Sequence, residues 1–233
     1  MIKKNQIKEK ILKLDITKKK EIVNAIQKAI AWKGKIDVLV NNAAYCVIGA
    51  IEESSEKEMK ATFETNVFGL VAVTKAILPI MRKQRSGHII NMSSHLGVQG
   101  KKGIGIHCAT KFAVEAISES LAQEVAQLNI KVTIIEPGPF RTPFIRNVVV
   151  SKEIGDYKNI MVPCKEHIKK IGTLAPGDVT KGACAIYAIT TMDKPPLRLP
   201  LGNLAVDEVL EKAYFLKKQA LENEQLSRNC DDK

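Results

Sequence analysis

The fold of this chain is constrained most by an alternation of short, uniformly apolar runs with longer amphipathic stretches. Apolar runs that lack polar alternation are typical of strands buried on both faces of a sheet. Helical stretches between such runs return the chain so that successive strands lie parallel. The runs predict strands at Ile11–Leu14, Ile36–Val40, His88–Met92, Lys131–Ile135 and Leu197–Leu201. We therefore expect an α/β fold built on a parallel sheet.

The amphipathic stretches predict helices at Lys18–Trp32, Met59–Lys83, His107–Leu128, Val179–Thr191 and Val206–Asn223. Within the third of these, apolar residues recur three or four positions apart, which is the spacing of one helix face. The predicted buried face comprises Phe112, Ala113, Ala116, Ile117, Leu121 and Val125, and the predicted solvent face carries Glu115, Glu119 and Glu124. The weakly patterned, proline-rich region Pro137–Gly177 predicts a long loop with one short helix at Cys164–Ile171, and long loops often carry function.

Length and charge limit the domain organisation and the partners. A chain of 233 residues with 45% hydrophobic residues can bury one substantial core, so we expect a single domain over residues 1–233. The formal net charge is +11, and the first 20 residues hold eight lysines against only Glu9 and Asp15. This lysine-rich start has no interleaved aromatic residues for base stacking. We interpret residues 1–10 as a flexible, solvated basic end and expect no nucleic-acid partner, with nucleic-acid binding through this end as a minor alternative.

The spacing of the cysteines and the length of the apolar stretches indicate the cellular compartment of the protein. Five cysteines are scattered without CxxC spacing, and no signal peptide pattern precedes them, so we expect neither a disulfide framework nor a metal site. Such cysteine usage is typical of the reducing cytoplasm. The longest apolar stretches fall short of the roughly 20 residues that a membrane span needs. We therefore expect a cytoplasmic protein without a membrane helix.

Residues that follow the predicted strands carry the candidate chemistry. In doubly wound sheets, ligands bind beyond the carboxyl ends of the strands. The positions there are Asn41–Ala44, Ser93-Ser94 and Glu136–Thr142. His107 and Lys111 lie one turn apart at the start of a helix, and position 107 follows Ser94 by thirteen residues. A hydroxyl, an imidazole and an ammonium group are expected to converge on one cleft.

These motifs, taken in order, resemble those of the classical short-chain dehydrogenase/reductase family. That family has an Asn-Asn-Ala-Gly turn, a helical Asn, a Ser, a Tyr-x-x-x-Lys pair and a Pro-Gly-x-x-x-Thr segment. The matching positions, within a resemblance that runs from about Ile11 to Gly202, are Asn41–Ala44, Asn66, Ser94, His107 with Lys111, and Pro137–Thr142. The resemblance implies a Rossmann-like, doubly wound parallel sheet with helices on both faces. It also implies NAD or NADP as cofactor, a carbonyl or alcohol substrate, and dimers or tetramers that pair through helix His107–Leu128.

The same resemblance assigns roles to individual residues. Ser94 would hydrogen-bond the substrate oxygen, and Lys111 would bind the nicotinamide ribose. Asn66 would hold a water that links Lys111 to solvent. The remaining cofactor contacts would be Asn41 and Ala43 beside the adenosine, Asp15 at the adenine, and Pro137, Gly138 and Thr142 at the nicotinamide carboxamide.

Two departures from the family pattern leave the activity open. His107 replaces the catalytic tyrosine; an imidazole can donate a proton, but it is shorter, and the neighbouring Lys111 opposes its protonation. No glycine precedes Gly34, so the glycine-rich turn and the first β-α-β unit of the family are missing, and strand Ile36–Val40 should have an unpaired edge. One interpretation is a working NAD(P)-dependent oxidoreductase that uses Asn66, Ser94, His107 and Lys111. The alternative is a catalytically impaired, truncated remnant, or a non-catalytic binding protein of the same fold.

Overall fold

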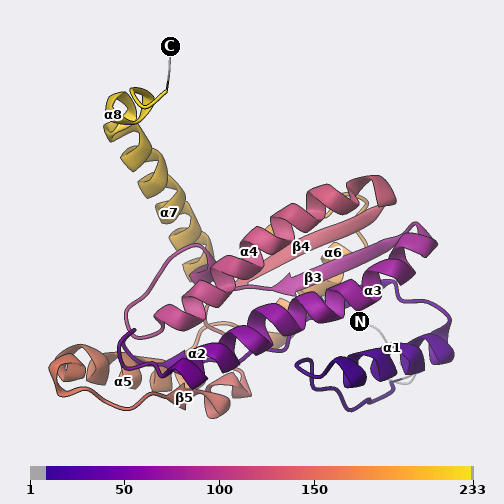
Figure 1. Ribbon diagram of the computed structural model, residues 1–233, viewed down its shortest axis with the longest axis horizontal. Coiled ribbons are helices and arrows are strands. Elements are labelled where there is room, and N and C mark those ends of the chain that lie inside the picture. Colours follow the sequence, from indigo (N-terminus) through magenta and orange to yellow (C-terminus); the bar gives the residue numbers. More distant parts are fainter. Residues whose placement is uncertain (1–8, 232–233) are drawn as a thin grey trace.

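A four-stranded sheet forms the centre of the structure, a computed structural model that describes residues 9–231 (Figure 1). Side chains at positions 146, 147, 169, 172 and 173 are not described, and most of the predicted basic end, residues 1–8, lies outside the described range. The strands are β1 (Val38–Asn41), β3 (Gly87–Met92), β4 (Ile130–Pro137) and β6 (Arg198–Leu201). They lie in the order β1-β3-β4-β6, and every neighbouring pair is parallel. The predicted α/β fold with a parallel sheet is confirmed.

Helices connect the strands, with shorter elements at their ends. The main helices are α1 (Lys19–Lys33), α2 (Glu56–Phe63), α3 (Leu70–Gln84), α4 (Gly105–Val125), α5 (Lys158–Leu174), α6 (Val179–Thr190) and α7 (Asn203–Glu222), and α7 is followed by α8 (Glu224–Arg228). A π-helical turn, η2 (Glu64–Gly69), joins α2 to α3. The 3-10 segments are η3 (His95–Gly97), η4 (Ala126–Leu128), η5 (Pro143–Asn147) and η6 (Gly155–Tyr157). A separate two-stranded parallel pair joins β2 (Val47–Ile48) to β5 (Val149–Val150).

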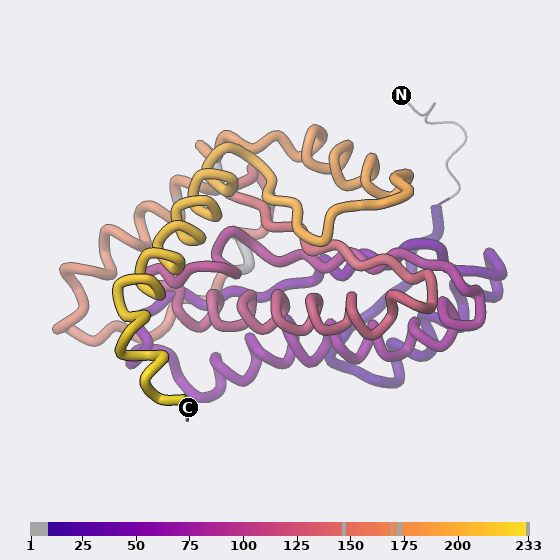
Figure 2. Tube along the Cα trace, turned by 90° about the horizontal axis from the view of Figure 1, so that it is seen from above, coloured from indigo at the N-terminus to yellow at the C-terminus, as the bar shows by residue number. Residues whose placement is uncertain are grey.

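Helices cover both faces of the sheet, as Figure 2 shows with α6 on one side and α3 and α4 on the other. The core on the α3 and α4 side also includes α1, and its buried members include Ile22, Ile77, Met81, Ile89 and Leu121. The core on the α6 side is formed by Ile90, Ile135 and Ile189. Neighbouring residues of β3, Ile89 and Ile90, thus point to opposite cores, because successive strand side chains alternate between faces. This two-sided burial is the reason why the strands are uniformly apolar.

The predicted strand Ile11–Leu14 is wrong. This segment forms no strand, and Ile11 is 95% exposed. A strand requires a hydrogen-bonded neighbour, and among the described residues only β3 pairs with β1. No described residue pairs with the other edge of β1, the unpaired edge that the sequence predicted, and Val38 and Val40 are exposed.

The predicted buried face of α4 is right at Leu121 and Val125, which are buried, and wrong in the earlier part of the helix. Glu115 is buried, whereas Phe112 is 42% exposed. Before Leu121, the buried positions are shifted by about one residue from the predicted face and comprise Lys111, Val114, Glu115 and Ser118. Glu115 can lie inside because Arg198 of β6 pairs with it, and a buried carboxylate needs such a partner.

Helix α5 is longer than predicted. The weak patterning of this region predicted only Cys164–Ile171, and a proline inside a helix removes one helical hydrogen bond. The structure nevertheless keeps Pro163 inside the 17-residue α5. Met161, which is 1% exposed, packs in a core with Cys46 and Ile48, and this burial holds the turn before the proline in place.

The stretch Glu56–Gln84, which includes α2, η2 and α3, is long and apolar enough to cross a membrane by length and composition. It is the one such stretch in the part of the chain that the structure describes. In α3, Val73, Ile77 and Met81 pack into the core on the sheet. Its apolar character therefore serves the domain core.

Candidate active site

A cavity of about 710 Å³ lies at the carboxyl ends of the strands, between the loops after β1, β3 and β4. Ligand sites typically enclose about 300–1,000 Å³. Residues singled out from the sequence that line it are Ala43, Ser94, His107, Lys111, Pro137, Gly138 and Thr142. The structure therefore brings Ser94, His107 and Lys111 to one cavity, although they come from two different elements.

Ser94 sits where the chain leaves β3 and starts η3. Its Oγ accepts a hydrogen bond from the Leu96 amide at 3.1 Å, which caps η3. The same Oγ lies 3.3 Å from Nδ1 of His95 and 3.5 Å from the carbonyl oxygen of Pro137. The hydroxyl is thus held in place by backbone groups and is adjacent to a second titratable ring.

Lys111 ties α4 to the end of β3. Its Nζ donates a hydrogen bond of 2.7 Å to the carbonyl oxygen of Met92, and the residue is 5% exposed. Burial lowers the pKa of Lys111 to about 8, while interactions with Cys46 and Glu115 act in the opposite direction. An ammonium group in this position presents a positive charge to the cavity next to Ser94.

His107 is a buried, neutral imidazole. Burial lowers its pKa to about 3, and the positive charge of Lys111 lowers it further. Its Nδ1 lies 3.4 Å from the carbonyl oxygen of Tyr45, which can only accept, so Nδ1 carries the proton. Its ring also lies 6.1 Å from that of Phe144. The other nitrogen, Nε2, is then a bare acceptor, and His107 is a poor proton donor.

Asn66 is not among the residues that line the cavity, but it binds the backbone of Tyr45 and the hydroxyl of Thr110, which lie close to His107. The π-helical turn η2 interrupts the helix at this point, and π-helical turns are frequent at functional sites. The Asn66 Oδ1 accepts from the Tyr45 amide at 2.7 Å, and its Nδ2 donates to the Tyr45 carbonyl at 2.8 Å and to the Thr110 hydroxyl at 2.9 Å. Asn66 therefore fixes the backbone group that faces His107.

Asn41 and Asp15 are not among the residues that line the cavity. Asn41 lies at the end of β1, where its Nδ2 donates to Thr74 at 3.0 Å and to Asn91 at 2.8 Å. The Asp15 carboxylate accepts from the Thr17 amide at 3.0 Å and the Thr17 hydroxyl at 2.7 Å, and these bonds lower its pKa. In this structure the Asn41 side chain thus bonds two side chains from α3 and β3, and the Asp15 carboxylate bonds the turn that follows it.

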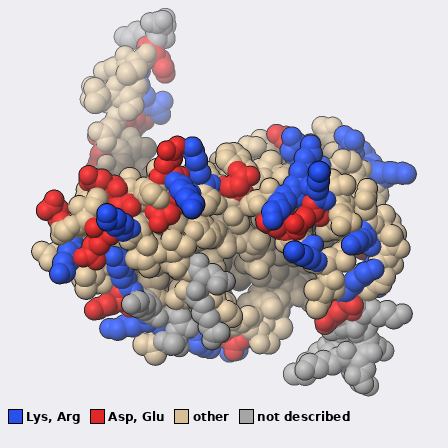
Figure 3. All heavy atoms as spheres, turned by 60° about the horizontal axis from the view of Figure 1, so that its bottom comes forward, with Lys and Arg blue, Asp and Glu red and all other residues tan. Residues whose placement is uncertain are grey.

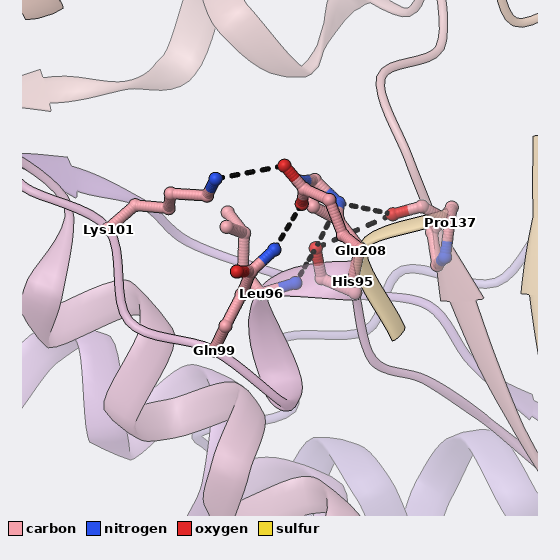
Figure 4. Close-up of polar contacts among 7 residues, drawn as sticks. His95, Leu96, Gln99, Lys101, Pro137 and Glu208 are labelled. Carbon is pink, nitrogen blue, oxygen red and sulfur yellow. Dashed lines mark hydrogen bonds and ion pairs between the residues drawn. The ribbon is translucent and has the colours of Figure 1, made fainter. Parts of the chain in front are cut away.

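Two groups of polar residues were missed from the sequence. One joins His95 to Glu208 of α7, with Gln99 and Lys101 on the same carboxylate (Figure 4). The proximity of His95 to Ser94 was a visible signal, but nothing in the sequence places Glu208 there.

The second group lies within the fold. Arg198 of β6 pairs with Glu115 and, at 2.6 Å, with Glu136, and both carboxylates are buried. Burial raises the pKa of Glu115 to about 7, and the neighbouring Glu136 adds to this, whereas Ser93 and Arg198 oppose it. Oε1 of Glu115 and Oε2 of Glu136 are buried without a hydrogen-bond partner.

The remaining side chains of interest are the possible metal ligands, the cysteines and the charged residues of the surface. Over residues 9–231, no group of three or more histidine, cysteine or acidic side chains is placed to hold a metal ion. All five cysteines are free thiols. On the face in Figure 3, lysine and arginine side chains lie among aspartate and glutamate side chains.

Comparisons with known proteins agree on one family. A family model described as short chain dehydrogenase matches residues 1–153. The 3-ketodihydrosphingosine reductase of Bacteroides thetaiotaomicron is 39% identical over 200 residues, which cover 84% of this chain and 74% of that protein. A short-chain dehydrogenase from Streptomyces avermitilis superposes with a TM-score of 0.86 at 38% identity, covering 94% of this chain and 81% of that one. A gluconate 5-dehydrogenase from Burkholderia cenocepacia, solved with NADP and tartrate, covers 57% of this chain and 52% of that one, with 27% identity and a TM-score of 0.55.

Proposed function

We propose that this chain, which belongs to the short-chain dehydrogenase family, is an oxidoreductase that interconverts a carbonyl and an alcohol in the cavity beside Ser94. The observation that carries the proposal is the shared cavity of Ser94, His107 and Lys111. A nicotinamide cofactor, NAD or NADP, supplies or accepts the hydride when it is bound. The NADP in the related gluconate 5-dehydrogenase supports this class of cofactor.

The residues at the cavity fit the nicotinamide half of such a cofactor. Lys111 offers a positive donor for the ribose hydroxyls, and Pro137, Gly138 and Thr142 offer backbone and hydroxyl groups for the carboxamide. Ala43 is small enough for a flat ligand to lie against the backbone. Asn41, Asp15 and the water held by Asn66 remain parts of the proposal on family resemblance alone. The first glycine of the sequence is Gly34, so the segment before it offers no glycine-rich turn of the kind that binds pyrophosphate.

The substrate class follows from the walls of the cavity. Ser94 provides a hydroxyl for the carbonyl oxygen, while Leu96, Ile104, Phe144 and Ile168 make the opposite walls largely apolar. We propose a ketone or secondary alcohol with an apolar substituent. The name of the Bacteroides relative, a reductase of a keto compound, agrees with this class.

The test is cofactor binding followed by turnover. Isothermal titration with NADH and NADPH should show binding in the micromolar to millimolar range that is usual for substrates and cofactors. Lys111→Met should weaken this binding, whereas the exposed Lys217→Met should not. A panel of aliphatic ketones and secondary alcohols then tests turnover. Absence of binding of either cofactor at about 1 mM would reject the proposal.

A second candidate function is a non-catalytic binding protein of the same family. It is favoured by His107, which is neutral and takes the place of the family's proton-donating tyrosine. Cofactor binding without turnover, together with turnover in His107→Tyr, would favour this candidate.

We also propose that the chain is cytoplasmic, acts as one domain over residues 1–233 and forms a homo-oligomer. Phe112 of α4 is 42% exposed and Phe68 of η2 is 57% exposed, which supports pairing of copies through α4. Light scattering coupled to size exclusion should show a dimer or tetramer. Phe112→Glu should convert it to monomer, and an unchanged mass would contradict this interface.

A further inference from the structure

His95, the residue after Ser94, makes contacts that the proposed reaction does not yet use. Its Nδ1 lies 2.9 Å from the carbonyl oxygen of Pro137, and its Nε2 lies 3.4 Å from Oε2 of Glu208 (Figure 4). The side chains of His95 and Glu208 are both only 13% exposed. A residue of η3 is thus joined to a residue of α7, more than a hundred positions later in the chain.

Both ring nitrogens of His95 lie close to oxygen atoms, Nδ1 to the carbonyl oxygen of Pro137 and Nε2 to the carboxylate of Glu208. A carbonyl oxygen and a carboxylate can only accept, whereas a neutral imidazole has one donor nitrogen. A doubly protonated ring can donate to both neighbours, and this is the state that a proton relay through His95 requires. The carboxylate compensates the positive charge in a site that is mostly withdrawn from water.

The charged groups around His95 are compatible with this state. Glu208 also accepts from Lys101, at 2.9 Å, and from Gln99, so that its carboxylate is held in one orientation. His107, whose own pKa is lowered partly by the charge of His95, is neutral. Lys111 is held on the Met92 carbonyl.

His95 lies close enough to Ser94 for a protonated His95 ring to pass a proton to the Ser94 hydroxyl. Nδ1 lies 3.3 Å from the Ser94 Oγ, so the Nδ1 proton is shared between Ser94 and the Pro137 carbonyl. His107 cannot supply a proton at neutral pH, because it is already neutral and its proton faces Tyr45. Besides Lys111, whose ammonium is held on the Met92 carbonyl, a cationic His95 would place a second donor next to the Ser94 hydroxyl.

We propose that His95 and Glu208 form a proton relay that acts through Ser94 on the substrate oxygen. This inference rests on the proposed oxidoreductase function. In the reducing direction, Ser94 Oγ–H passes its proton to the substrate oxygen as the carbonyl carbon gains a hydride from the reduced nicotinamide. The C=O π bond is replaced by C–H and O–H bonds, Ser94 Oγ takes the Nδ1 proton of His95, and solvent returns a proton to the ring. In this scheme His95 and Glu208 are positioning residues, because neither needs to touch the substrate.

The first experiment measures the protonation of His95 without any turnover. The chain has only four histidines, so long-range ¹H–¹⁵N spectra resolve each ring, and His95→Asn identifies the signal. Wild type should show the imidazolium pattern for His95 at neutral pH. Glu208→Gln should convert this signal to the neutral ring, whereas Glu211→Gln, an exposed carboxylate one turn further along α7, should not. A neutral His95 in wild type, or no response to Glu208→Gln, would overturn the relay.

The second experiment measures turnover with the same variants. His95→Asn keeps an N–H group near the Nδ1 position but cannot release a proton, so a purely structural role should survive it. The relay predicts a fall in kcat of about 10²-fold, the lower end of the usual acid–base contribution, with unchanged cofactor affinity and a changed pH profile of kcat. Glu208→Gln should also lower kcat, and Glu211→Gln should match wild type.

A wild-type rate and pH profile in His95→Asn would overturn the relay while leaving the oxidoreductase proposal intact. If wild type binds neither NADH nor NADPH, the oxidoreductase proposal fails, and the proton relay through Ser94 fails with it even where the spectra show a cationic His95.

Discussion

Replacing His107 with tyrosine is expected to raise turnover, because it restores a hydroxyl that can exchange a proton at the cavity. His107 lines the cavity, so the longer side chain has open space in front of it. The positive charge of Lys111 favours the ionised form of a nearby phenol, as it disfavours the imidazolium of His107. One substitution therefore reverses the effect of Lys111 on the acid–base group.

The size of the effect follows from the pKa of His107. With a pKa of about 3, the ring is protonated at pH 7 in roughly one molecule in 10⁴, since each pH unit is a factor of ten. A general acid or base in position contributes about 10²–10⁴-fold to a rate. We expect His107→Tyr to raise kcat by about 10²-fold or more, and His107→Phe, which has the same ring without the hydroxyl, to stay close to wild type.

The assay follows the absorbance of reduced nicotinamide with the ketone panel for wild type and both variants. Thermal unfolding of each variant serves as the control for folding. A strong loss of activity in His107→Phe would mean that the imidazole itself takes part in the reaction. Equal rates for the tyrosine and phenylalanine variants, with both folded, would refute the reasoning about the missing hydroxyl.

Three further predictions concern stability and association. Asn66→Ala should lower the free energy of unfolding by about 1–3 kcal/mol in chemical denaturation, because it leaves the buried backbone groups of Tyr45 unsatisfied, and a loss below about 0.5 kcal/mol would contradict that role. The raised pKa of Glu115, about 7 against 4.5 for an exposed glutamate, means that its contribution to stability is complete below pH 4.5 and is lost as the pH rises through 7. Glu115→Gln should flatten that dependence by at most about 3 kcal/mol, and an unchanged pH profile of denaturation would show that the folded protein does not hold this proton. Val40→Lys, at the open edge of β1, should change stability by less than about 0.5 kcal/mol and reduce concentration-dependent light scattering, unless this edge is covered in solution.

The sequence predicted correctly those strands that are both buried between helices and hydrogen-bonded to a neighbouring strand. The runs His88–Met92 and Lys131–Ile135 form the two central strands, and their apolar character reflects contact with helices on both faces. Ile11–Leu14 has the same composition but no neighbour to pair with among the described residues, so apolar composition alone predicted a strand that is not there.

The candidate site was predictable as a set of positions but not as a set of contacts. Spacing along the chain and the edge rule for parallel sheets bring Ser94, His107 and Lys111 to one cavity. Spacing carries no information about partners that arrive from other elements, and Glu208 reaches His95 only because α7 begins directly after β6. Asn66 shows the same limit, since its bonds to the Tyr45 backbone depend on a π-helical turn that no local pattern indicated.

The misjudged face of α4 has a physical explanation that links fold and site. Lys111 and Glu115 are one helical turn apart, so a rotation of α4 that brings Lys111 to the Met92 carbonyl also buries Glu115. Burial of that carboxylate would be costly without a counter-charge, and Arg198 of β6 provides one while also pairing with Glu136 of β4. The apolar Phe112 is then left on the outside. The orientation of the candidate catalytic lysine thus depends on an arginine near the end of the sheet, and an amphipathic pattern read along α4 alone cannot include that contribution.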